Sequence, residues 1–107
     1  MALASKYLWI VNMNTDAAET AFSKHALAMG ATGVCVRTSS TRLPDAINRF
    51  HDLGMKVFAW RWPPANQAGC DREADLVVRL IRRGLDGYIV DPESDRAGAS
   101  NDWNRTV

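Results

Sequence analysis

Hydrophobic residues along the chain form four short runs, and three longer segments of mixed apolar and polar residues separate them. The runs are almost continuously apolar, as is typical of strands that are buried on both faces of a parallel sheet. They predict strands at Tyr7–Met13, Gly33–Arg37, Lys56–Trp62 and Asp86–Asp91. Because helical segments alternate with these strands, right-handed crossovers should make the sheet parallel.

The segments between the strands have the spacing and the end signals of helices. Each closes on a glycine, at Gly30, Gly54 and Gly84, and glycine suits the left-handed residue that often ends a helix. A first helix is predicted over about residues 17–29, with Asp16 and Glu19 as a capping box. Its apolar stripe would contain Ala18, Ala21, Phe22, His25 and Met29.

The second and third helices are predicted from the same kind of pattern. Pro44 fits the first turn of the second helix. The buried positions of this helix would be Ile47, Phe50 and Leu53. Those of the third helix would be Ala74, Val77, Val78 and Ile81.

Two architectures fit four parallel strands alternating with three helices in an α/β domain. One is half of a TIM-type (β/α) barrel, and the other is an open flavodoxin-like sheet. We favour the half-barrel, because a doubly wound domain usually continues to a fifth strand and a last helix. Residues 94–107 are expected to be a tail or the truncated start of a fourth helix. Since a full barrel takes about 250 residues, we expect a missing second half or a homo-oligomer that completes the sheet.

Length, composition and charge place this chain in the class of single globular domains. Its 107 residues are 47% hydrophobic and 23% charged, and the net charge of +1 provides no basic surface for nucleic acid. Cys35 and Cys70 lack metal or disulfide spacing, so both are expected to be reduced. With no signal peptide and no run of about 20 apolar residues, the prediction is a cytoplasmic protein without a membrane partner.

Two carboxylates at the end of the fourth strand are the strongest candidates for chemistry. Asp91 and Glu93 are two positions apart, which in an extended chain places both on one face, about 6 to 7 Å apart. Their mutual repulsion raises the proton affinity of one, which allows an acid and a base to coexist near neutral pH. Two structural interpretations stay open beside this one: a solvated strand end and a cap for the next helix.

Other polar and aromatic residues fall at the same ends of the predicted strands, where ligands of parallel α/β proteins collect. Trp60 and Trp62 share a face and are either a platform for a sugar ring or filling for a barrel interior. Arg37 could clamp an anionic group or make a structural ion pair. Arg61 has the opposite parity and is expected to face the helices or pair with an acid. Asn12 and Asn14 complete the set of predicted binding residues.

Metal and nucleotide chemistry have little support in the sequence. His25 and His51 lie on helices, far from the strand ends, and have no third ligand at useful spacing, so no metal site is predicted. The residues after the first strand, NMNTDAAE, contain no glycine-rich phosphate loop. No cofactor is therefore expected.

The segment LDGYIVDPE, residues 85–93, resembles the fourth-strand signature DGxDxDxE of family-18 chitinases. Asp86, Gly87, Asp91 and Glu93 match in register, while Ile89 replaces the middle aspartate. The segment is also similar to the shorter DxE of family-25 lysozyme-type barrels. The third strand lacks the SxGG sequence of chitinases.

The resemblance implies a glycoside hydrolase-like half-barrel that acts on chitin or peptidoglycan. In such a protein Glu93 would be the general acid and Asp91 the carboxylate that stabilises the developing positive charge. Activity would depend on a complete barrel, and Ile89 cannot replace the missing aspartate. The alternatives are a binding module that holds carbohydrate without turnover and a scaffold that self-associates.

Overall fold

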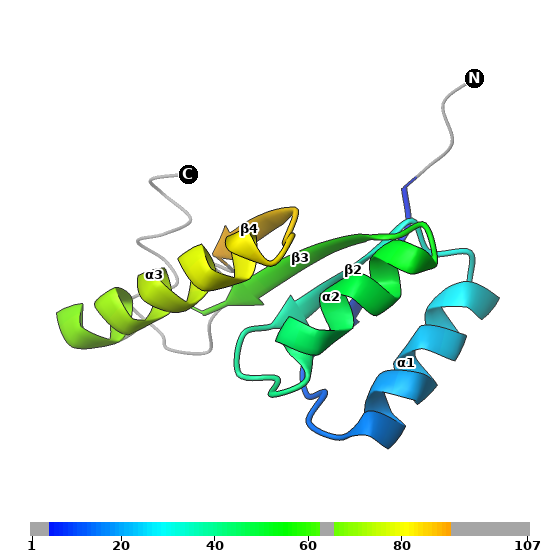
Figure 1. Ribbon diagram of the computed structural model, residues 1–107, viewed down its shortest axis with the longest axis horizontal. Coiled ribbons are helices and arrows are strands. Elements are labelled where there is room, and N and C mark those ends of the chain that lie inside the picture. Colours follow the sequence, from blue (N-terminus) through cyan, green and yellow to red (C-terminus); the bar gives the residue numbers. More distant parts are fainter. Residues whose placement is uncertain (1–4, 63–65, 91–107) are drawn as a thin grey trace.

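The computed structural model of this protein describes residues 5–62 and 66–90, which form four strands and three helices. In chain order these are β1 (Tyr7–Ile10), α1 (Asp16–Ala28), β2 (Gly33–Arg37), α2 (Leu43–Asp52), β3 (Lys56–Arg61), α3 (Gln67–Arg82) and β4 (Gly87–Val90). The predicted α/β fold, with strands and helices in strict alternation, is confirmed (Figure 1).

The strands form one parallel sheet in the order β1-β2-β3-β4. The pairing Trp9↔Cys35↔Phe58↔Gly87 runs across all four strands and shows that they are aligned side by side. Each strand therefore lies beside its neighbour in the sequence, so that β1 and β4 form the two edges of the sheet.

One face of the sheet packs on the helices and makes the hydrophobic core. From the strands, Ile10, Val34, Val36, Val57 and Ala59 are fully buried in this cluster. The helices contribute Ala26 of α1, several residues of α2 and Leu80 of α3 to the same cluster. Alternate strand residues thus point into a single core between the sheet and one layer of helices.

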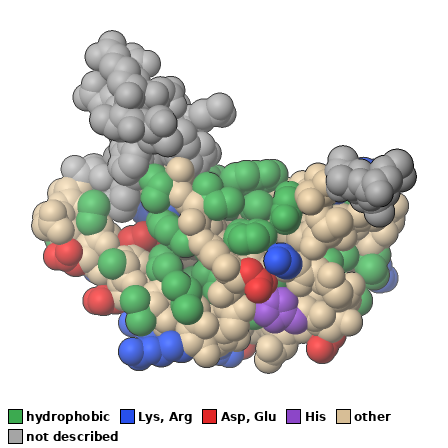
Figure 2. All heavy atoms as spheres, turned by 90° about the horizontal axis from the view of Figure 1, so that it is seen from above, with side chains coloured by type: hydrophobic (Ala, Val, Ile, Leu, Met, Phe, Trp, Pro, Cys, Tyr) green, Lys and Arg blue, Asp and Glu red, His purple; other side chains and the backbone are tan. Residues whose placement is uncertain are grey.

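The other face of the sheet, the open face, is covered by none of the helices in residues 5–62 and 66–90. Figure 2 shows a broad group of hydrophobic side chains at the molecular surface. A doubly wound sheet carries helices on both faces, and the flavodoxin order begins 2-1-3. The sequential strand order and the single helix layer of the described residues match consecutive units of a (β/α) barrel.

The predicted helix ends are confirmed, whereas some strand ends differ. Gly30, Gly54 and Gly84 all have positive φ, between 70° and 109°. The first strand ends at Ile10 and not at Met13, because Met13 is buried outside the sheet and its N–H donates to Ser40 Oγ at 3.1 Å. The third strand ends at Arg61, one residue early, and the fourth begins at Gly87, one residue late.

The buried face of the first helix overlaps the predicted one only in part, since Ala18 and Phe22 pack against the core as expected. Its buried residues are Glu19, Ser23 and Ala26, whereas Ala21 and His25 are exposed. The predicted capping box of Asp16 and Glu19 does not form. Thr15 is the cap instead, and its side chain accepts from the Ala18 N–H at 3.0 Å. The many alanines of this helix make several of its faces apolar, so the hydrophobic pattern alone did not identify the buried one.

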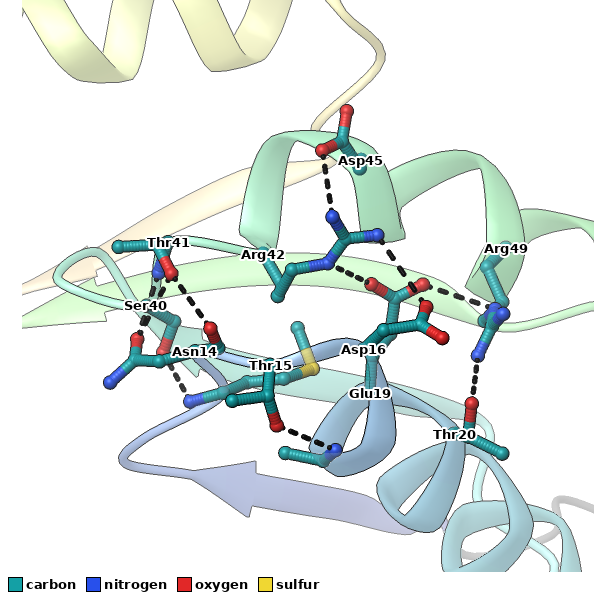
Figure 3. A network of polar contacts seen from close by, with 12 residues as sticks. Asn14, Thr15, Asp16, Glu19, Thr20, Ser40, Thr41, Arg42, Asp45 and Arg49 are labelled. Atoms are coloured by element: carbon teal, nitrogen blue, oxygen red, sulfur yellow. Dashed lines mark hydrogen bonds and ion pairs between the residues drawn. The ribbon is translucent and has the colours of Figure 1, made fainter.

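Glu19 explains why this face is turned inward. Its carboxylate is 3% exposed, accepts from Arg42 Nε at 2.8 Å and forms an ion pair with Arg49, whose Nε lies 3.0 Å away (Figure 3). Arg49 also donates to Thr20 at 3.0 Å. A buried acid between Arg42, at the N-terminal cap of α2, and Arg49 of α2 therefore joins α1 to α2.

The second helix agrees with the prediction and the third does not. Ile47 and Phe50 of α2 are fully buried, and Pro44 lies in its first turn. On α3 the predicted Ala74, Val78 and Ile81 are exposed and Val77 is half-buried. Residues 73, 76, 77 and 80 face the sheet instead, because the buried stripe is rotated by one position to include an acid, Glu73.

Glu73 is held by residues of two strands. Its carboxylate accepts from Tyr88 OH at 2.9 Å and from Arg61 Nη1 at 3.3 Å, as expected for an arginine that faces the helices. Burial and the hydrogen bond to Glu73 raise the pKa of Tyr88, so the phenol stays protonated.

None of the helices in the described part of the chain is long and apolar enough to cross a membrane.

Candidate functional site

The open face is lined mainly by large apolar side chains and contains a hollow of about 380 Å³. Tyr7 and Trp9 of edge strand β1 remain 37% and 50% exposed. The hollow is lined by Tyr7, Trp9, Cys35, Phe58, Gly87, Tyr88 and Ile89. Burial raises the pKa of the Cys35 thiol to about 11, so this cysteine is a protonated, apolar part of the floor.

Two glycines let aromatic rings lie across neighbouring strands of this face. A Cβ atom on Gly33 would lie 2.6 Å from a ring carbon of Tyr7 and 2.9 Å from the carbonyl oxygen of Lys56. A Cβ atom on Gly87 would lie 2.8 Å from the ring of Phe58. The rings of Tyr7 and Phe58 therefore occupy space that any larger residue at these glycines would fill.

Three tryptophans and one arginine form a connected group, the tryptophan–arginine cluster (Trp9, Trp60, Trp62 and Arg37). The ring centroids of Trp9 and Trp60 are 5.6 Å apart, and those of Trp60 and Trp62 are 5.9 Å apart. The Arg37 guanidinium lies over the Trp62 ring, 4.6 Å from its centroid. This cluster leads from the open face to the carboxyl ends of β2 and β3.

The two predicted tryptophans have different positions within this cluster. Trp60 is only 4% exposed, and its indole N–H donates to the Ile10 carbonyl oxygen at 3.2 Å. Its ring is therefore a buried support whose polar atom is already used. Trp62 is half-buried and follows the end of β3 directly.

Arg37 is the last residue of β2 and pairs with Trp60 across the strands. It is half-buried, and its Nε is buried without a hydrogen-bond partner among residues 5–62 and 66–90. Its guanidinium carbon lies over both tryptophan rings, 4.6 Å from the centroid of Trp62 and 5.9 Å from that of Trp60. Stacking of this kind leaves the in-plane N–H donors of an arginine available for another group.

The two predicted asparagines lie in the loop between β1 and α1. Asn14 Oδ1 accepts from the Thr41 N–H at 2.9 Å, and the Asn14 carbonyl oxygen accepts from Thr41 Oγ1 at 3.3 Å (Figure 3). Asn14 thus joins its loop to the loop before α2. Asn12 is exposed, at the same edge of the sheet.

The two predicted catalytic carboxylates, Asp91 and Glu93, lie outside the described residues. The described part of the chain ends at Val90, the last residue of β4, which Asp91 follows directly. The assignment of these two residues as acid and stabiliser stays a prediction.

A second polar contact lies near the amino ends of β3 and β4, away from the predicted binding residues. Asp86 Oδ2 lies 2.8 Å from His51 Nε2 and accepts from the Val57 N–H at 2.7 Å. Burial alone would raise the pKa of Asp86, but the hydrogen bonds from Val57 and His51, with the charges of His51 and Lys56, lower it. This contact joins the end of α2 to the start of β4.

No group of three metal-ligating side chains occurs among the described residues.

Two features of this region were not predicted from the sequence. Trp9 joins the cluster because alternation along β1 places it on the same face as Tyr7, a pattern that could have been read from the sequence. The second feature is that Arg37 has no carboxylate partner among the described residues, and this could not have been read from the sequence.

No family model, no curated protein and no solved structure matches this chain. The similarity of residues 85–93 to glycoside hydrolase signatures therefore stays a resemblance of one short segment.

Proposed function

We propose that this chain binds carbohydrate at the carboxyl edge of its sheet, as a glycoside hydrolase-like half-barrel. The observation that carries the proposal is the half-buried ring of Trp62, held between Trp60 and Arg37 at this edge. An indole ring offers a flat apolar surface to a sugar, and nearby polar groups can serve the hydroxyls. Asn12, exposed at the same edge, is such a group.

The proposed chemistry adds the two carboxylates that follow β4 along the chain. Glu93 protonates the glycosidic oxygen of a polymer such as chitin or peptidoglycan, and Asp91 stabilises the positive charge that develops on the sugar. The alternative is a module that binds the same polymers without cleaving them. Both versions use Trp62 in the same way, so binding and turnover have to be measured separately.

Binding is tested by titrating the intrinsic tryptophan fluorescence with chitin and peptidoglycan oligomers. Trp62→Ala should weaken binding by about tenfold, since an aromatic contact contributes up to about 1.5 kcal/mol. Trp62→Phe, which keeps a ring, should retain part of the affinity. The proposal fails if neither oligomer changes the fluorescence, or if Trp62→Ala binds as tightly as the original protein.

Turnover is measured on the same oligomers by product analysis. For a hydrolase, Glu93→Gln should release no products while it still binds, because the amide cannot supply the proton. Binding without products in the unchanged protein would identify the non-catalytic module.

We also propose that a second copy of this chain covers the open face. The apolar hollow and the exposed rings of Tyr7 and Trp9 support this, since large exposed apolar patches mark interaction sites. No further strand of the described residues pairs with β1 or β4, so both edges can pair with a strand of another copy. Placing β4 of each copy beside β1 of the other gives a closed barrel of eight parallel strands. The interior of an eight-stranded barrel is narrow enough for side chains to fill it.

Sedimentation equilibrium tests this assembly. The expected mass is twice the 11.9 kDa of one chain, and Trp9→Glu should reduce it to a single chain because the new charge would be buried. Leu27→Glu is the matched control, since Leu27 is 52% exposed on α1, on the helix side of the molecule. A mass of one chain at every concentration, or dissociation by both variants, would contradict the proposal.

A further inference from the structure

Four arginines in the described part of the chain are half-buried: Arg37, Arg42, Arg49 and Arg61. Three of them are paired with buried carboxylates. Arg42 and Arg49 contact Glu19 at 2.8 and 3.0 Å, and Arg61 contacts Glu73 at 3.3 Å. Arg37 has no ion pair with any of the described residues, so it departs from the pattern that the other three follow.

The surroundings of Arg37 make this difference informative. Removing an N–H group from water without giving it a partner costs free energy, and Arg37 Nε is such a group. The rings of Trp60 and Trp62 fix the guanidinium from the side but cannot accept its in-plane hydrogen bonds. A positive charge with free donors is thus held beside the ring at which we propose that carbohydrate binds.

We infer that the ligand of this edge is an acidic carbohydrate whose carboxylate pairs with Arg37. The inference rests on the proposed function and adds the chemical class of the ligand. A guanidinium and a carboxylate are both planar and can form two parallel hydrogen bonds, which is the strongest pairing available to an arginine. A sugar ring on Trp62 places a carboxylate carried by that ring, or by its substituent, next to the guanidinium.

Isothermal titration calorimetry with two probes separates this inference from the proposed function. The probes are trigalacturonate, which carries carboxylates, and N-acetylglucosamine trimer, which is neutral. The protein should bind trigalacturonate at least about tenfold more tightly than the neutral trimer. Arg37→Gln should lower the affinity for trigalacturonate by about tenfold more than it lowers the affinity for the neutral trimer, and so remove the preference. Arg37→Lys should keep part of it, and Arg72→Gln is the control for charge, since Arg72 is exposed on α3.

Different outcomes contradict the inference of an acidic ligand and the proposed carbohydrate binding. Equal affinity for both probes, a preference that survives in Arg37→Gln, or an equal loss for both probes would overturn the inference and leave carbohydrate binding intact. Absence of binding by both probes would overturn the proposed function, and this inference with it. A structural role is tested by urea unfolding of Arg37→Met: an unchanged or higher midpoint supports a ligand-directed arginine, and a clear loss of stability contradicts it.

Discussion

Replacing Trp60 by alanine is expected to lower the free energy of unfolding by about 3–5 kcal/mol, the range for truncating a buried aromatic residue. Trp60 is 4% exposed, contacts the rings of Trp9 and Trp62, and donates to the Ile10 carbonyl oxygen across the sheet. Truncation removes all of these contacts at once. Urea unfolding followed by circular dichroism measures the change.

Two matched variants separate the parts of this effect. Trp60→Phe keeps a ring but loses the indole N–H, and should cost about 1–2 kcal/mol, because a buried carbonyl oxygen loses its partner. Trp62→Ala removes a half-buried ring and should cost less than Trp60→Ala. If Trp62→Ala were the more destabilising of the two, the assignment of Trp60 as the support and Trp62 as the ligand-facing ring would be wrong.

Replacing Glu19 by glutamine is expected to destabilise the protein by about 2–3 kcal/mol, although the side chain keeps its shape. An amide has one accepting oxygen in place of two, and its NH₂ group would face the two arginines that now form ion pairs with Glu19. Breaking a fully buried ion pair costs roughly 3–5 kcal/mol. The expected loss is smaller because the side chains of Arg42 and Arg49 keep 32% and 38% of their surface exposed.

Asp16 offers a control on the same helix. It lies 3.8 Å from Arg42 and its side chain is 77% exposed, so Asp16→Asn should change the free energy of unfolding by less than about 1 kcal/mol. Chemical unfolding of both variants gives the comparison. Equal effects of the two substitutions would show that burial of Glu19 does not set its contribution.

The layout of the fold could be read from the sequence because it depends on local signals. Continuous apolar runs mark the strands, and the glycines at 30, 54 and 84 end the helices where predicted. The buried faces of α1 and α3 could not be read in the same way. Each contains an acid, Glu19 or Glu73, whose partners lie on other elements, 23 residues along the chain for Arg42 and 15 for Tyr88.

The candidate site was predictable in part for the same reason. Alternation places Trp60 and Trp62 on one face, and both lie in the cluster with Arg37. Alternation cannot show that Trp60 is buried and Trp62 only half-buried, because this depends on Trp9 from another strand. Nor can it show that Arg37 lacks an acidic partner among the described residues, which is a property of the assembled surface.

The hydrogen bonds between Asn14 and Thr41 have a consequence for the thermodynamics of binding. Together with the bond from the Arg42 N–H to the Met13 carbonyl oxygen, at 3.0 Å, they hold two loops at the carboxyl edge before any ligand arrives. Ordering a flexible backbone costs about 1–2 kcal/mol per residue. A preorganised rim avoids this entropy loss on association, so few contacts suffice for measurable affinity at this edge.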